Sequence, residues 1–239
     1  MGIRHVVAGL AVVSGGLLLT ACGWEGPGTK FTDNEAIGQT ITEVRFSNDS
    51  GDVKIRVGDT TSVRRDVKYD EDKPGKTYRV DDGHTLILEE CPTRNCRVGY
   101  DVVVPAGTKV NGHVDSGNVE LAGVASANVQ SESGDITVRD VAGEVNATAQ
   151  SGNVDVSGIG GTVVAGAESG NVTVGLSAPQ DVSASTESGD IEVSVPSADY
   201  EVNASSDSGR IDNQLSGDDS AGHKLDLRAD SGDITVSRA

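Results

Sequence analysis

Aromatic side chains are scarce in this chain, at 3% of its 239 residues. Six of the seven lie before residue 101, and only Tyr200 follows. The C-terminal part must therefore build its core from Val, Ile, Leu and Ala. This composition suits thin, regularly stacked β layers better than a thick irregular core. A long helical pattern is also missing after residue 30.

Basic residues are few, with 19 Lys and Arg against 37 Asp and Glu, which gives a formal net charge of −18. Nucleic-acid binding requires a basic face, so the balance argues against a nucleic-acid partner. It also argues against contact between the folded surface and anionic lipid. Two interpretations stay open: the charge keeps a surface protein soluble, or part of it binds cations.

Long apolar runs are limited to the N-terminus. Val6 to Leu19 is apolar apart from Gly and one Ser, and it follows a short basic region. A run of this length is shorter than the roughly 20 residues of a transmembrane span. The alternatives are an ordinary signal peptide or a buried apolar helix. "LTAC", residues 19–22, resembles the bacterial lipobox, which implies cleavage before Cys22 and acylation of that residue.

This resemblance sets the expected organisation of the N-terminal part. Residues 1–21 are expected to be a lipoprotein signal peptide, and residues 22–34 a lipidated flexible tether. The mature protein would then sit on the extracytoplasmic face of the cell membrane, held by its acyl chains.

Cysteine is almost absent, and the two remaining residues, Cys91 and Cys96, flank the short segment "CPTRNC". Outside the membrane, two cysteines across a Pro-containing turn indicate a disulfide. A C-x4-C metal half-site is the alternative, but the sequence offers no obvious second pair of ligands. With Cys22 lipidated, no thiol is left for nucleophilic catalysis.

A repeated Ser-Gly pair, usually followed by Asp or Asn, organises the rest of the chain. Apolar residues alternate on both sides of each pair, so each block predicts strand, tight turn and strand. Glycine suits the turn because it adopts positive φ at little cost. From Ser116 the spacing is 17 to 23 residues. The pairs begin at Ser50, Ser116, Ser133, Ser151, Ser169, Ser188, Ser208 and Ser231.

One such block cannot bury its own apolar face, whereas stacked copies can. We therefore predict an all-β, single-domain β-solenoid over residues 35–239, with a period of about 18 residues. An antiparallel hairpin closed by Ser-Gly also fits the alternation. Residues 58–104 break the period and are predicted to form an antiparallel β insertion that caps the N-terminal end. The other end is expected to stop on its last strand, "SGDITVSRA".

The "SGDV", "SGNV" and "SGDI" blocks, "VPAGTKV" at residues 104–110, and the "CPTRNC" hairpin together resemble a bacterial family, the putative-adhesin domain of unknown function, in its lipoprotein form. The resemblance implies a β-solenoid-like stack and supplies no catalytic residues. "SGRIDN" departs from the pattern, because Arg210 replaces Asp or Asn and Asn213 falls at an inward position.

Two rows of mostly acidic residues flank the Ser-Gly corner, one just before the Ser and one two residues after it. Stacking would bring their carboxylate and amide oxygens together, which is chemistry that suits weak Ca²⁺ binding. Turn chemistry on a solvated face is the alternative. The candidate Ca²⁺ ligands are Glu132, Asp135, Glu168, Glu187, Asp190, Asp230 and Asp233.

These features favour a non-catalytic, membrane-anchored envelope protein that presents a rigid, repetitive β surface for adhesion to a glycan or protein. We expect a monomer with no cofactor besides weakly bound Ca²⁺. An accessory or sensing subunit of a membrane complex is one alternative. A glycan-active β-helix enzyme is another, because β-helices can host paired carboxylates on one face.

Overall fold

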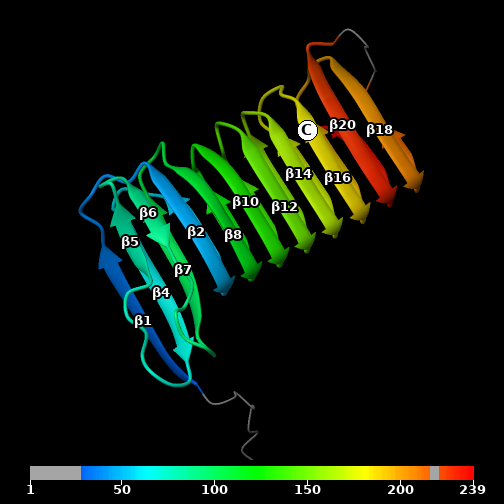
Figure 1. Cartoon of the computed structure of the whole chain (residues 1–239). Coiled ribbons are helices and arrows are strands. Elements are labelled where there is room, and N and C mark those ends of the chain that lie inside the picture. Colours follow the sequence, from blue (N-terminus) through cyan, green and yellow to red (C-terminus); the bar gives the residue numbers. More distant parts are fainter. Residues whose placement is uncertain (1–27, 216–220) are drawn as a thin grey trace, which may run out of the picture.

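The computed structural model describes residues 28–215 and 221–239. The signal peptide predicted for residues 1–21 and the acylation site Cys22 lie outside the described residues. The described residues form two long β-sheets and no helix, so the predicted all-β class is confirmed (Figure 1). None of them forms a helix with the length and hydrophobicity that a membrane span requires.

Sheet A contains eleven strands. In spatial order they are β1 (Thr29–Ala36), β4 (Ser62–Tyr69), β7 (Arg97–Val104), β3 (Val53–Val57), β9 (Val119–Ala122), β11 (Ile136–Arg139), β13 (Val154–Ile159), β15 (Val172–Leu176), β17 (Ile191–Val195), β21 (Ile234–Arg238) and β19 (Ile211–Asn213).

Sheet B contains ten strands and faces sheet A. In spatial order they are β18 (Tyr200–Ser208), β20 (His223–Ser231), β16 (Val182–Ser188), β14 (Val163–Ser169), β12 (Val145–Ser151), β10 (Ser126–Ser133), β8 (Lys109–Ser116), β2 (Glu43–Ser50), β6 (Thr85–Leu88) and β5 (Tyr78–Asp81).

Each Ser-Gly pair carries the chain from sheet B to sheet A. β10 leads into the corner at Ser133 and β11 leaves it, yet neither pairs with the other. Instead β10 pairs in parallel with β8 and β12, and Ser133 stands beside Ser116 and Ser151. The antiparallel hairpin alternative is therefore wrong, and the β-solenoid prediction is confirmed.

The alternating apolar residues of both sheets meet in one hydrophobic core. In β11 and β12, Ile136, Val138, Val145 and Ala147 are fully buried, while the residues between them face outward. The core cluster reaches from Ile41 to Val236, and Phe31 packs against it. The core cluster itself lies within the predicted domain of residues 35–239, and Phe31, which falls in the predicted tether, adds to it from β1. Small side chains such as Ala147 and Ala165 suffice because the two layers lie close together.

Glycine at the corner is required by backbone conformation and by stacking. Gly152 has a φ of 149°, which L side chains rarely adopt. A Cβ at this position would also overlap the carbonyl oxygen of Gly134, the corner glycine of the preceding coil. The same overlap recurs at Gly134, Gly170 and Gly189. Each corner therefore rests directly on the backbone of the corner before it.

The N-terminal end is capped, as predicted, but the cap is only partly antiparallel. β4 pairs antiparallel with β7, and β5 with β6. The inner strands β7 and β6 continue the two sheets in parallel, beside β3 and β2. The strand β1 closes the edge of sheet A antiparallel to β4. The tether predicted for residues 22–34 therefore ends before Thr29, because the chain from there onward is an edge strand.

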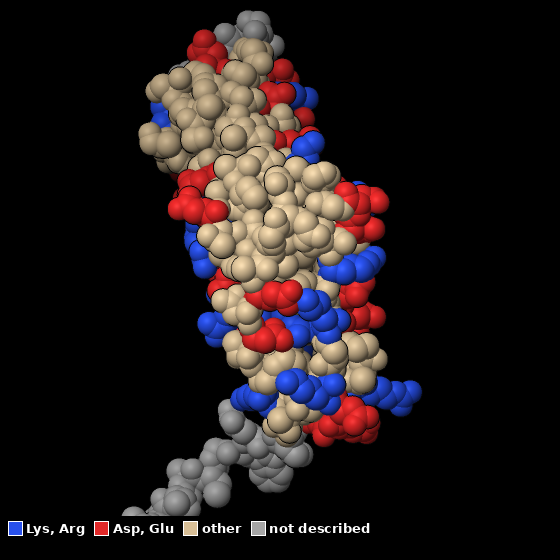
Figure 2. Space-filling model, turned by 90° about the vertical axis from the view of Figure 1, so that its left-hand side faces the viewer, with Lys and Arg blue, Asp and Glu red and all other residues tan. Residues whose placement is uncertain are grey.

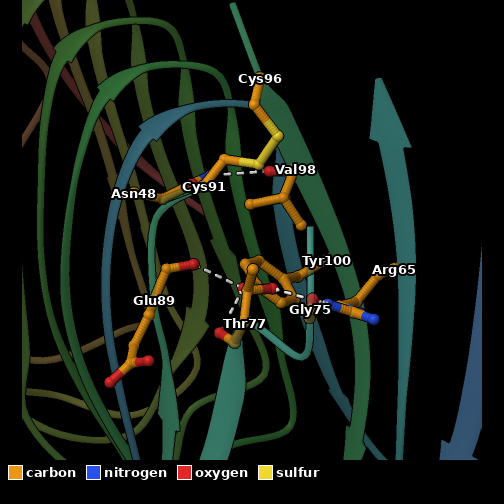
Figure 3. Close-up of a disulfide and its surroundings, with 9 residues drawn as sticks. All are labelled: Asn48, Arg65, Gly75, Thr77, Glu89, Cys91, Cys96, Val98 and Tyr100. Atoms are coloured by element: carbon orange, nitrogen blue, oxygen red, sulfur yellow. Dashed lines mark hydrogen bonds between the residues drawn. A yellow bond between two sulfur atoms is a disulfide. The ribbon is translucent and has the colours of Figure 1, made fainter. Parts of the chain in front are cut away.

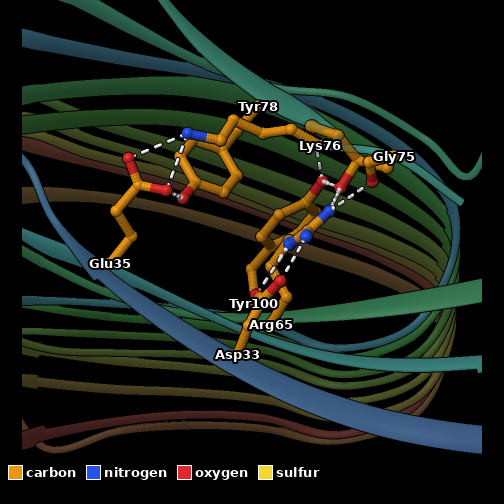
Figure 4. A network of polar contacts seen from close by, with 8 residues as sticks. Asp33, Glu35, Arg65, Gly75, Lys76, Tyr78 and Tyr100 are labelled. Atoms are coloured by element: carbon orange, nitrogen blue, oxygen red, sulfur yellow. Dashed lines mark hydrogen bonds and ion pairs between the residues drawn. The ribbon is translucent and has the colours of Figure 1, made fainter.

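Arg65 anchors this cap from the inner face of β4 (Figure 4). Its guanidinium forms a bidentate ion pair with Asp33 of β1 and donates to Gly75 O at 2.9 Å and Thr77 Oγ1 at 3.1 Å. Because Arg65 is only 4% exposed, these partners are what make its burial tolerable. The Arg65 hydrogen bond holds the pKa of Asp33 below its usual range.

A disulfide joins Cys91 to Cys96 beside this network (Figure 3). The loop that it closes precedes β7, and the Nδ2 of buried Asn48 donates to Val98 O at 3.0 Å, just after that loop. Tyr100 of β7 places its hydroxyl 2.7 Å from Thr77 O and 2.6 Å from Glu89 O. Burial raises the pKa of Tyr100 to about 12. The disulfide and these bonds hold the irregular segment between β4 and β7 against the stack.

The C-terminal end differs from the expectation that the chain stops on its outermost strand. The last coil, β20 and β21, lies between the coil of β16 and β17 and the coil of β18 and β19. The end of the stack is therefore residues 200–213. Asn213, expected at an inward position, is exposed there, and Ile211 is 45% exposed. Polar residues around this edge hinder pairing with other chains.

The corner geometry predicts a large cost for Gly152→Ala. Positive φ and overlap with Gly134 O should together lower the free energy of unfolding by about 2–5 kcal/mol in urea denaturation. Gly175→Ala is the matched control, because its added Cβ would lie 3.7 Å from Ser157 Cβ in ordinary contact. Equal stability of the two variants would contradict the stacked-corner account.

The Asp33–Arg65 pair predicts a pH dependence. The pKa of Asp33 is lowered in the folded state, so its contribution is complete above the unfolded value of about 3.9 and is lost as pH falls through the folded value. Asp33→Asn should lower stability at pH 7 and flatten the loss of stability below about pH 4. Urea unfolding at several pH values measures both, with Asp59→Asn, an exposed carboxylate, as the control. An acid profile unchanged by Asp33→Asn would refute this role.

Candidate functional site

The row two residues after each corner Ser forms a continuous hydrogen-bonded ladder. Asn118 Oδ1 accepts the backbone N–H of Asp135 at 2.9 Å, and Asp135 Oδ1 accepts that of Asn153 at 2.8 Å. The pattern continues through Asn171 and Asp190. Asp and Asn recur here because either side chain offers an oxygen one coil away from a backbone donor at the turn.

Three of the candidate Ca²⁺ ligands, Asp135, Asp190 and Asp233, belong to this ladder. One carboxylate oxygen of each is engaged by a backbone N–H, so turn chemistry accounts for these positions. The ladder ends at Arg210, whose N–H donates to Asp233 Oδ1 at 2.8 Å. No coil follows Arg210 in the described stack, and its side chain instead pairs with Asp233 Oδ2 at 3.0 Å. The Arg210 backbone N–H and guanidinium lower the pKa of Asp233.

The other four candidates, Glu132, Glu168, Glu187 and Asp230, line a shallow groove on the outer face of sheet B. The groove has a volume of about 610 Å³ and runs across β8, β10, β12, β14, β16 and β20. Its floor is made of small or polar side chains three residues before each corner Ser: Gln130, Thr148, Gly166 and Ser185. The sequence predicted the acidic row but not the hollow beside it, which exists because Thr148, Gly166 and Ser185 are short.

His113 of β8 stands at one end of the groove. Its Nε2 lies 2.8 Å from Asp115 Oδ1 and 4.0 Å from Glu132 Oε1. One imidazole and two carboxylates within 4.8 Å of one another can ligate a divalent transition metal. His113 was assigned no role in the sequence analysis. The sequence signal for this cluster was that His113 and Asp115, two residues apart, fall on the same outer face of one strand. Glu132 occupies the position of Asp115 in the next repeat.

Carboxylates crowd beyond this end of the groove. The neighbouring Asp49 carboxylate raises the pKa of Glu90, and the Asp115 charge adds to the effect. Arg228 stands at the opposite end, within 3.1 Å of Asp230 and 3.7 Å of Asp207. The groove therefore offers hydroxyl and amide groups along its floor, acidic groups along one wall, and a cation at one end.

The ladder predicts different outcomes for two substitutions of one residue. Asp135→Ala removes the acceptor of the Asn153 N–H and should lower stability by about 1 kcal/mol, whereas Asp135→Asn keeps an acceptor and should change it little. Urea denaturation compares the two variants. If both lose the same stability, the charge of Asp135 matters rather than its hydrogen bond. Calorimetric titration with Ca²⁺ on both variants separates the ladder from a cation site.

Two solved structures are similar to this chain at low sequence identity. A putative cell adhesion protein from Clostridium sporogenes ATCC 15579 shares 15% identity, with a TM-score of 0.36 and coverage of 88% of this chain and 100% of that chain. A putative adhesin from Bacteroides fragilis NCTC 9343 shares 13% identity, with a TM-score of 0.48 and coverage of 88% and 97%.

No curated protein matches the chain. A family model does match, and it covers most of the solenoid and its cap. The model described as Toastrack DUF4097 matches residues 38–237, and the chain therefore belongs to this family.

Proposed function

We propose that the protein is a non-catalytic envelope lipoprotein that uses the outer face of sheet B to bind an extended polar partner, a glycan or a peptide segment. The observation that carries the proposal is the groove of about 610 Å³ beside the Ser-Gly corners. Its floor and wall repeat the same kinds of polar group from coil to coil. Such a surface suits a partner that is itself repetitive and hydrogen-bonding.

The spacing of the groove is set by the backbone. Thr148, Gly166 and Ser185 are cross-strand neighbours in register, so their side chains follow one another at the strand spacing of about 4.8 Å. The backbone beneath them is fixed by parallel pairing on both sides. A ligand that lies along the groove would therefore meet polar groups already held in place, which reduces the entropy lost on binding.

The chemistry of the acidic rows supports a binding role over a catalytic one. Residues at equivalent positions repeat along the stack, and those of the ladder hold backbone N–H groups of the next coil. Acylation at Cys22 completes the proposal, since it would hold the solenoid at a membrane by its capped end. The chain from Thr29 enters the fold at that cap, so the groove would extend away from the anchor.

Filling the groove tests this proposal. Gly166 lies on the outer face of β14, and Gly166→Arg would place a long side chain across the floor between Thr148 and Ser185. We expect binding of the purified chain to cell-wall material from its own organism to weaken about tenfold or more. Gly175→Arg on the outer face of β15 is the matched control, because it adds the same group to sheet A.

Pull-down with insoluble wall material and titration with soluble wall fragments give the readout. Wild-type protein that binds neither wall material nor surface proteins of intact cells would sink the proposed function. Equal losses in the two glycine variants would move the binding face away from the groove.

A further inference from the structure

The net charge of this chain is not evenly distributed. Residues 28–104 contain 12 Lys and Arg against 15 Asp and Glu, a net of −3, whereas residues 105–239 contain 6 against 21, a net of −15. Figure 2 shows Lys and Arg side chains gathered over the part of the molecule where β1 begins. The cap therefore differs in electrostatic character from the acidic solenoid behind it.

Three cations stand side by side on the outer face of sheet A in this cap. Lys30 of β1 is the cross-strand partner of Lys68 of β4, and Lys68 is that of Arg97 of β7. Like charges directly opposite one another destabilise a sheet. Lys68 and Arg97 have no ion-pair partner among the described residues. The apposition of Lys68 and Arg97 is unfavourable alone and becomes favourable when an anion lies across the row.

A hollow of about 920 Å³ opens beside this row, which we call the cationic row. Glycines at 51, 99 and 117 leave backbone exposed in its lining. Five Lys and Arg side chains line it against three acidic ones, a net of +2 in a chain of −18. The hollow is thus positively charged, and a ligand in it could reach backbone atoms at the three glycines.

The three acidic residues in the hollow already have partners. Asp66 accepts from the Thr32 hydroxyl and pairs with Arg64 at 3.4 Å, and Asp101 lies 3.7 Å from Arg56. Asp52 Oδ1 accepts the backbone N–H of Asn118 at 2.9 Å. Lys54 pairs with Glu120 at 3.1 Å. Lys68 and Arg97, which have no such partner among the described residues, therefore supply the excess positive charge.

The position of the row relative to the proposed anchor identifies its partner. Six residues lie between Cys22 and Thr29, and the seven Cα-to-Cα steps that join the two span at most about 25 Å. Lys30 is the second residue of β1, so an acylated Cys22 would hold the cationic row within that distance of the lipid headgroups. Net charge alone predicts no contact with anionic lipid, but a local basic cluster next to an acyl anchor does attract it.

We propose that the cationic row of Lys30, Lys68 and Arg97 docks on the phosphate groups of anionic lipids, with the hollow beside it receiving a headgroup. The acidic solenoid is then repelled by the same surface, so the rod stands away from the membrane with its capped end down. The proposal rests on the proposed anchoring at Cys22 and names the lipid chemistry that complements it.

The test uses the chain from residue 23, which lacks the acyl anchor and contains the whole core. It is mixed with vesicles of equal parts phosphatidylglycerol and phosphatidylcholine, or of phosphatidylcholine alone, and sedimented at low and high salt. We expect binding to the anionic vesicles only, weakened by salt. Replacing the row with Gln at 30, 68 and 97 should reduce the partition constant on the order of 100-fold.

Lys109→Gln, Arg139→Gln and Lys224→Gln combined form the matched control, because they change the net charge equally at solenoid positions. Three results would overturn the proposal: equal binding to both vesicles or to neither, a row variant that binds like wild type, or a control variant that loses as much. Displacement by inorganic phosphate, but not by chloride at the same ionic strength, would assign the hollow to free phosphate instead. Circular dichroism verifies that every variant is folded.

Failure of this proposal is distinguishable from failure of the anchor. Acylation is read separately, from the mass of the N-terminal peptide of membrane-purified full-length protein. Acylated protein whose unanchored form ignores anionic vesicles would leave the anchor intact and remove the docking surface. Binding of anionic vesicles by the cationic row, together with an unacylated Cys22, would leave the docking surface intact and remove the anchor.

Discussion

The close approach of successive corners is the constraint on which the rest of this structure depends. A residue with a Cβ cannot occupy the corner, because the carbonyl oxygen of the previous corner fills that space. Glycine at the corner of each layer lets successive backbones come into contact. This contact sets the strand register of both sheets at once. Once register is fixed, the apolar alternation, the Asp and Asn ladder and the outward groove follow from residue parity alone.

Much of this could be predicted from sequence because the repeat encodes it locally. The Ser-Gly period, the Val and Ile alternation and the near-constant spacing sufficed for the two-sheet solenoid. Sequence could not exclude the antiparallel hairpin, because apolar and polar residues alternate in the same way in both arrangements. Only strand pairing separates the two. The sequence signal for the exchanged spatial order of the last two coils was weak and consisted of Arg210 and Asn213. Their departure from the repeat has its reason in the end position of that coil.

The candidate site was predicted in part. Both acidic rows were located, but sequence could not tell that one row has its oxygens committed to backbone donors while the other borders a hollow. The approach of His113 to Glu132 depends on which strands are neighbours, and so does the apposition of Lys68 and Arg97. In the aperiodic segment between Gly58 and Val104, no repeat specifies the neighbour, so pairing there is decided by tertiary packing.

The intercalated last coil has a consequence for how the molecule is made. A chain that folds as it emerges can add layers in order only as far as Val195. The coil at residues 200–213 then lacks its final pairing partner, because its strands pair with those of residues 223–238, which are made later. That end of the rod can therefore close only after residues 223–238 have been made, and it closes when this segment inserts between two coils made earlier. The coil at residues 223–238 is thereby paired on both sides, whereas the coil at residues 200–213 has a neighbour on one side only.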